Sequence, residues 1–155
     1  MKVVKLCMLM MIVAGASVAQ TVIPMDKDGL LNGEGMGLAS VAEFNGYPGP
    51  KHAIAQKDEL GISPDQMKII VDLANGVEVS AKLKGEDIVA AESELAKMFE
   101  TGAATEKGVK AKLQEIGKLR AELRYLHLQA HLRMKQILSA NQIARYKELQ
   151  PHEAK

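Results

Sequence analysis

The sequence predicts an all-α protein, an elongated helical hairpin of about four helices that follows an irregular N-terminal arm. Three observations predict this fold. Apolar residues recur in steps of three and four through most of the C-terminal half of the chain. Two Ser-x-x-Gln helix-start signals flank that region, at 63–66 and 139–142. Aromatic residues make up only 3 % of the chain, which disfavours a β-sandwich.

The first nineteen residues are typical of a cleaved secretory signal. Lys2 and Lys5 supply a positive start, residues 6–16 form an uncharged apolar run, and Ser-Val-Ala at 17–19 is a small-x-small cleavage site before Gln20. The apolar run is too short to span a bilayer. We therefore expect a periplasmic protein that begins at Gln20 and has no membrane span after cleavage.

The only cysteine, Cys7, lies inside this signal. The mature chain is therefore expected to lack disulfides and thiolate ligands, and a metal site would have to use His, Asp, Glu or Met. The formal net charge of +1 argues against a general polyanion binder, and the few aromatic residues argue against nucleic-acid stacking.

The mature chain divides into an arm, a hairpin domain and a tail. Residues 20–60 are rich in Gly and Pro, and the turn sequence at 45–50 would stop a helix, so we expect one short helix near 37–44. Residues 61–150 form the hairpin domain, and residues 151–155 form a tail.

The hairpin begins at a capping box. Ser63 and Gln66 bracket Pro64 at the first helical position, which predicts a helix from there to about Leu83. Gly85 is expected to kink or break the chain before a second helix over 86–99.

A third, long helix is predicted behind Thr105, which can serve as its N-cap. A last short helix is expected from about Leu138 to Leu149. The apolar stripe of the long helix follows steps of three and four: Val109, Leu113, Ile116, Leu119, Leu123, Leu126, Ala130, Met134 and Ile137.

Charge is partitioned between the two halves of the hairpin. Residues 57–100 hold ten acidic and five basic residues, whereas residues 101–135 hold eight basic and three acidic. The explanation we favour is that antiparallel helices, or two protomers, neutralise one another. A ligand-binding basic face is the alternative.

The paired helix starts resemble the two LTxxQ motifs of the Spy/CpxP superfamily of periplasmic helical-hairpin proteins. The matching segments are Ile-Ser-Pro-Asp-Gln at 62–66 and Leu-Ser-Ala-Asn-Gln at 138–142, with Ser in place of Thr in both. That superfamily includes ATP-independent chaperones, stress-signalling inhibitors, a zinc-responsive member, and nickel and cobalt sensors. The resemblance implies a helical hairpin and a role in envelope stress or heavy-metal sensing.

A closer resemblance extends outside the hairpin. The segments 33–39, 42–52 and 123–132 look like a proteobacterial subgroup labelled as periplasmic heavy-metal sensor or resistance proteins. This resemblance covers nearly the whole mature chain and implies a protein that responds to metal ions.

The candidate metal ligands centre on the sequence His-Leu-Gln-Ala-His. His127 and His131 lie one helical turn apart, a spacing at which two imidazoles can bind one ion. His52, behind a rigid turn, could supply a third nitrogen, and Glu92 on the facing helix a carboxylate. Such a set suits Zn, Ni or Co. The alternative is that the histidine pair is a half-buried, hydrogen-bonded feature of the helix interface.

Two functions are compatible with these features. No nucleophile motif, HEXXH motif or phosphate-binding loop is present, so an enzyme and an organic cofactor are not expected. The first function is metal binding. The alternative is a chaperone that holds unfolded periplasmic proteins on a concave apolar surface, or a partner of an envelope-stress sensor. We also expect a homodimer. The cations that would rim the client surface are Arg120, Arg124, Arg133 and Lys135.

Overall fold

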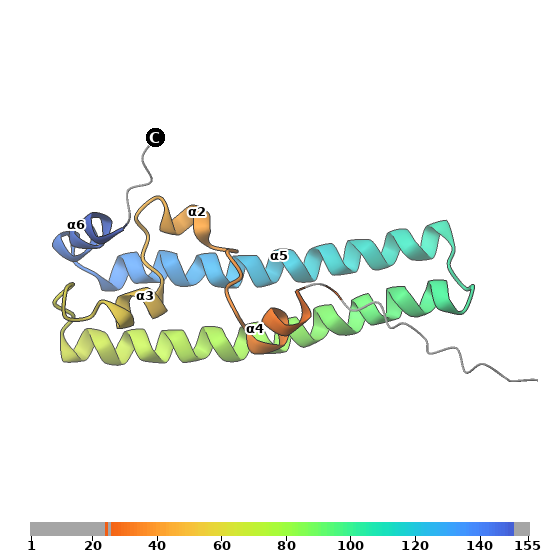
Figure 1. Cartoon of the computed structure of the whole chain (residues 1–155), viewed down its shortest axis with the longest axis horizontal. Helices are drawn as coiled ribbons and strands as arrows, with labels where there is room; N and C mark the ends of the chain where they lie inside the picture. The colour runs from red at the N-terminus through yellow and green to blue at the C-terminus, as the bar shows by residue number, and fades with distance from the viewer. Residues whose placement is uncertain (1–23, 25, 151–155) are drawn as a thin grey trace, which may run out of the picture.

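A computed structural model describes residue 24 and residues 26–150 of the chain, which form six helices and no strand. The helices are α1 (Lys27–Asn32), α2 (Ser40–Glu43), α3 (Pro50–Ala55), α4 (Pro64–Glu100), α5 (Glu106–Ile137) and α6 (Ala140–Leu149). The two long helices pack together as an antiparallel hairpin (Figure 1). The all-helical prediction is confirmed, whereas the predicted signal (1–19), the start at Gln20 and the tail (151–155) lie outside the described residues.

Both predicted capping boxes are present, and their glutamines also bond to each other. Ser63 accepts from the backbone N–H of Gln66, and Ser139 accepts in the same way from Gln142. The Gln66 amide donates to Gln142 Oε1 at 2.9 Å, and Gln142 donates back at 3.0 Å. The second N–H of each amide donates to a backbone carbonyl, that of Ile137 or that of Gly61. This network joins the start of α4 to the start of α6.

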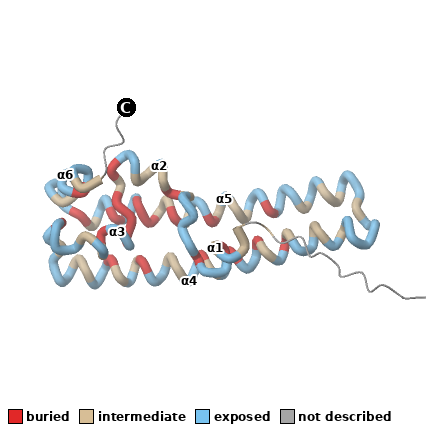
Figure 2. The backbone as a smooth tube through the Cα atoms, in the orientation of Figure 1, coloured by how far each residue is buried: buried red, intermediate tan, exposed pale blue. Residues whose placement is uncertain are grey.

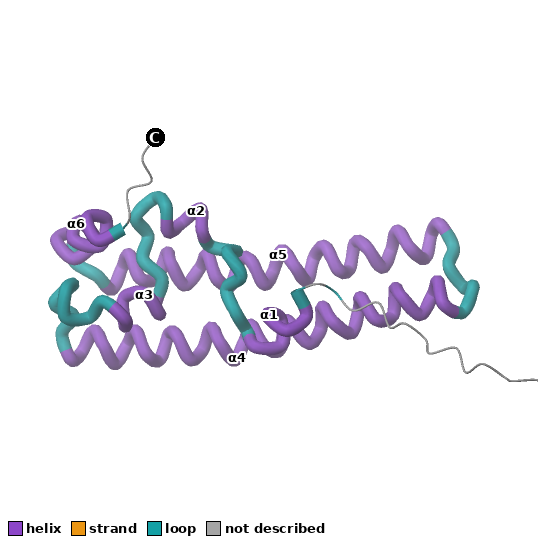
Figure 3. Tube along the Cα trace, in the orientation of Figure 1, coloured by secondary structure: helices purple, strands orange, loops and turns teal. Residues whose placement is uncertain are grey.

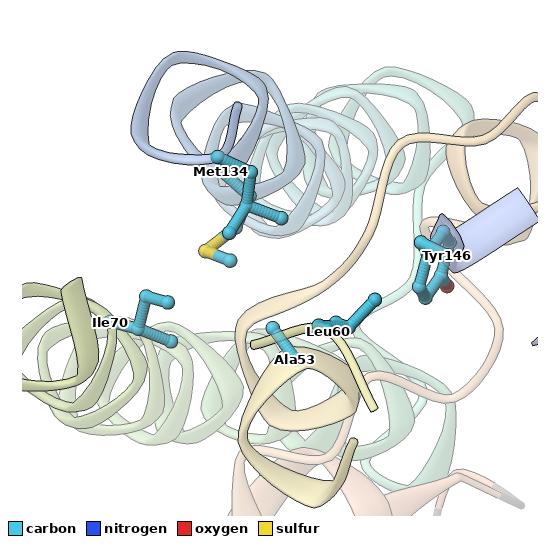
Figure 4. Close-up of a cluster of buried hydrophobic side chains, with 6 residues drawn as sticks. Ala53, Leu60, Ile70, Met134 and Tyr146 are labelled. Atoms are coloured by element: carbon cyan, nitrogen blue, oxygen red, sulfur yellow. The ribbon is translucent and has the colours of Figure 1, made fainter. Parts of the chain in front are cut away.

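An apolar core fills the base of the hairpin beside this network. Figure 4 shows Ile70 of α4 and Met134 of α5 reaching toward each other, with Ala53 and Leu60 beside them. Tyr146 of α6 closes the cluster and is fully buried. Burying a side chain of this size stabilises the fold by roughly 1.5–3 kcal/mol.

The expected break at Gly85, with a separate second helix over 86–99, is wrong, because α4 runs as one helix from Pro64 to Glu100. Gly85 is buried, and a Cβ atom at this position would overlap the backbone carbonyl of Leu30. Leu30 belongs to α1 and packs into a second core cluster with Ile88 and Leu123. Because residue 85 has no side chain, the backbone of α1 can pack directly against α4.

The N-terminal arm (residues 20–60) has more helix than predicted. The expected short helix near 37–44 is present as α2, and α1 and α3 are two further short helices that the sequence analysis did not expect, while the rest of the described arm is irregular. An ion pair holds the start of the arm, since Arg120 donates to Asp26 at 2.7 Å and holds the pKa of that carboxyl below its usual range.

The arm and α6 cover only one half of the hairpin. Figure 2 shows that buried backbone is concentrated in that half, while the part toward the α4–α5 turn is mostly exposed or intermediate. Figure 3 shows the loops of the arm crossing the two long helices there. Leu113, a member of the predicted apolar stripe, is accordingly 53 % exposed. Among the described residues, no helix is both long enough and apolar enough to cross a membrane.

We predict that Gln66→Ala and Gln142→Ala each lower the free energy of unfolding by about 1–3 kcal/mol, because each leaves partly buried polar groups unpaired. The double variant should lose less than the two single losses added together, by about 0.5–3 kcal/mol, because both substitutions break the same bonds. Urea unfolding measures this. Gln136→Ala, an exposed change on α5, should stay within about 0.5 kcal/mol, and strict additivity would contradict the shared network.

Two glycines of α4 form a second, matched test. Gly76→Ala faces open space and should raise the free energy of unfolding by about 0.5–1 kcal/mol, since alanine is the better helix former. Gly85→Ala should lower it, because the new methyl group would displace α1. If both substitutions stabilise the protein in urea unfolding, α1 does not pack on Gly85 as described.

Candidate functional site: three histidines and a glutamate around one cavity

Four titratable side chains from three helices meet where the arm crosses the hairpin. His127 and His131 project from α5, and the continuous helix keeps them on one side, one turn apart. His52 lies in α3, which begins with Pro50 at its first position. Glu43 is the last residue of α2.

These side chains line a cavity of about 200 Å³, and Lys51 and Glu78 are also among its lining residues. Lys51 of α3 donates to Glu78 of α4 at 3.2 Å. The cavity therefore lies between the arm and both long helices, and anything bound in it would contact all three.

The tautomer of His131 follows from one hydrogen bond. Its Nδ1 lies 2.8 Å from the backbone carbonyl of Tyr47, and a carbonyl can only accept, so Nδ1 carries the proton. In the neutral ring Nε2 is then an unprotonated nitrogen. The ring fits here because residue 49 is glycine: a Cβ atom there would lie 2.9 Å from His131 Cε1.

His127 is buried without a partner for one of its nitrogens. The residue is 8 % exposed, and its Nε2 has no hydrogen-bond partner among the described residues. Burial lowers the pKa of His127, and the nearby His131 and Lys51 lower it further. The imidazole is therefore held in the neutral form that a metal ion requires.

Glu43 lies between two of the histidines. Its Oε1 is 3.6 Å from His52 Nδ1 and 3.7 Å from His131 Nε2. The fully buried Tyr146 lies next to His52, with its hydroxyl oxygen 3.4 Å from His52 Nδ1. Burial, together with the Glu43 carboxylate, raises the pKa of Tyr146 to about 12, so this phenol stays protonated.

The structure brings together three of the four predicted metal ligands. His52, His127 and His131 share the cavity, whereas Glu92 is not among its lining residues and accepts from Arg120 at 3.0 Å. Arg120 lies seven residues before His127, which is about 10 Å along the helix. Glu92 therefore belongs to the ion pair that holds α1.

Sequence reasoning missed Glu43. Its only signal was its place in the 42–52 segment, shared with His52, which follows it by nine residues. The carboxylate reaches the histidines because the turn after α2 brings the chain back over α5, where Tyr47 bonds to His131.

The four predicted client-binding cations differ in how they are placed. Arg120 is held by two carboxylates, and Lys135 lies 4.1 Å from the centre of the Tyr47 ring. Arg124 and Arg133 are exposed. Two of the four are thus engaged by the arm and its ion pairs.

No three His, Cys, Asp or Glu side chains in the described part of the chain already form a group that could hold a metal ion. The side chains around the cavity would therefore have to move before they could share one ion. Searches for known relatives found no matching family model, no matching curated protein and no matching solved structure.

We predict that His127 makes stability depend on pH. Because its pKa is lowered in the folded state from about 6.5, the unfolded chain takes up the proton first as pH falls. Its contribution is therefore present above about pH 6.5 and is lost as pH falls toward the folded pKa. The melting temperature should fall more steeply between about pH 7 and 5 in the wild type than in His127→Gln, and parallel curves would contradict this.

Proposed function

We propose that this chain is a non-enzymatic periplasmic protein of the Spy/CpxP type that binds a divalent transition metal ion, Zn, Ni or Co. Its role would be heavy-metal sensing or resistance to envelope stress. The observation that carries the proposal is the meeting of three imidazoles and one carboxylate at a single cavity, where His127 Nε2 is buried without a partner.

The donor set fits such an ion in kind. His131 would offer Nε2, because its Nδ1–H donates to the Tyr47 carbonyl, and metal-binding histidines commonly donate their other ring N–H to a carbonyl or carboxylate in this way. His127 would offer Nε2, and Glu43 would supply a hard, anionic oxygen. Imidazole with carboxylate suits Zn, Ni and Co, whereas Mg²⁺ prefers oxygen ligands alone.

Metal binding would then act on the arrangement of the arm. Glu43 and His52 belong to α2 and α3, while His127 and His131 belong to α5. An ion shared by these helices would bind the arm to the hairpin. A sensor needs such a coupling, because an ion shifts a conformational equilibrium only by its differential affinity for the two states.

The alternative function is an ATP-independent chaperone. The observation that favours it is an open apolar groove near the α4–α5 turn, lined by Phe99, Val109 and Leu113, with Phe99 62 % exposed. Unfolded periplasmic proteins would be its clients, or an envelope-stress sensor its partner. Its predicted basic rim is reduced, because Arg120 and Lys135 have partners within the fold.

We predict that Zn²⁺, Ni²⁺ or Co²⁺ raises the melting temperature of the wild type above pH 7, whereas Mg²⁺ does not. An ion that binds only the folded state adds about 2.7 kcal/mol at a hundredfold excess over its Kd, which corresponds to roughly 5–15 °C here. His127→Ala with His131→Ala should abolish the rise, and Glu43→Gln and His52→Ala should each reduce it.

Glu92→Gln is the matched control. It removes a carboxylate that lies away from the cavity, so the metal-induced rise should equal that of the wild type. If the double histidine variant keeps the full rise, or if the wild type shows none, the histidines are a packing feature. The chaperone function would then be favoured, and it can be tested by whether the protein, at a stoichiometric concentration, keeps an unfolded model protein from aggregating.

A further inference from the structure

The outer surfaces of the two long helices carry exposed apolar residues with opposite flanking charge. We define the α4 edge as Asp72, Val79, Leu83, Glu86 and Ala90, and the α5 edge as Lys118, Ala121, Tyr125 and Leu132. All nine residues are exposed. The largest apolar ones are more than half exposed: Val79 60 %, Leu83 59 %, Tyr125 61 % and Leu132 54 %.

Helical geometry places these edges opposite the core. Val79 lies nine residues from both Ile70 and Ile88, and nine steps of 100° amount to half a turn. The same spacing separates Tyr125 from Ile116 and from the fully buried Met134. The two edges therefore face outward on opposite sides of the hairpin, away from the arm and the cavity.

We infer that the α4 edge of one copy of this chain packs against the α5 edge of a second copy. Charge decides between the possible pairings. Two α4 edges would bring Asp72 and Glu86 against their own copies, and two α5 edges would do the same with Lys118. Between residues 72 and 90 the charged residues of the α4 edge are carboxylates, with the exposed Lys68 and Lys97 on the same side of the helix beyond its two ends, and the α5 edge carries an ammonium group, so the two edges complement each other.

The register of the hairpin supports the same pairing. Within the chain, Lys112 bonds Glu94 and Lys84 bonds Glu122, which shows which residues of α4 and α5 lie at the same level. A second copy placed alongside in the same orientation, without axial shift, brings Leu83 level with Tyr125. The antiparallel direction of α4 and α5 is repeated across the new contact.

This contact is heterologous, because each copy uses two different surfaces. Every copy retains one free α4 edge or α5 edge after pairing, so the contact extends into a row or closes into a ring. The predicted homodimer is then its smallest unit. Each edge is narrow, so association should be weak, as for interfaces below about 1,200 Å².

Cysteine cross-linking at about 100 µM, a concentration suited to weak contacts, tests the pairing in the full chain with Cys7→Ser. A mixture of Leu83→Cys and Tyr125→Cys proteins should give cross-linked dimers with a short bis-maleimide, while neither protein alone should. The chain that carries both substitutions should give dimers, trimers and larger products. Ser80→Cys, exposed at the same level but a quarter turn from the α4 edge, is the matched control and should not cross-link to Tyr125→Cys.

Charge reversal provides an independent measurement by sedimentation velocity. Glu86→Lys should lower the sedimentation coefficient at high concentration, and mixing with Lys118→Glu should restore association, because the two reversed edges complement each other. Efficient cross-linking of Leu83→Cys with itself would overturn the inference in favour of an α4–α4 contact. An absence of product in the mixture, with both proteins folded by circular dichroism, would overturn any contact between these edges.

Discussion

The paired amides of Gln66 and Gln142 are the constraint on which the rest of the structure depends. Each glutamine caps its own helix and bonds to the other, so the positions at which α4 and α6 start are set together. With both starts fixed, α5 must return antiparallel to α4 and end beside Gln66, whose side-chain amide donates to the backbone carbonyl of Ile137. The apolar core at the base of the hairpin, including Tyr146, is assembled beside this joint.

The packing of the arm against the hairpin determines the burial and protonation of the histidines at the candidate site. On a hairpin without the arm, an i, i+4 histidine pair would be exposed to solvent, and each imidazole would take up a proton as the pH falls below about 6.5. Here the arm covers the pair, which keeps His127 neutral and fixes the tautomer of His131. The arm also carries Glu43, so the segment that buries the histidines supplies the anionic ligand as well. A site built in this way couples the chemistry of the imidazoles to whether the arm is docked.

Local signals in the sequence predicted the capping boxes, the long helix α5 and the histidine pair, because each depends on residues within one or two turns. Gly85 and Glu92 were misjudged for the same reason. A glycine inside a helix suggests a break unless one knows that Leu30 packs against it. A carboxylate on a facing helix looks like a ligand unless one knows that Arg120 holds it. Both facts depend on contacts between residues more than 25 positions apart, which periodicity does not encode.

The order in which the chain is synthesised has a consequence for the Asp26–Arg120 ion pair. The two residues are separated by 94 positions, and His131 and Tyr146, which lie beside Glu43 and His52, are also made late. The arm is translated first, and α1 and α3 can pack on α4 as soon as it follows, but these other contacts must wait for α5 and α6. Because α4 and α5 are neighbours in sequence, they can pair as soon as both have emerged. The cavity should therefore close last, when α5 and then α6 bring His131 and Tyr146 to the arm.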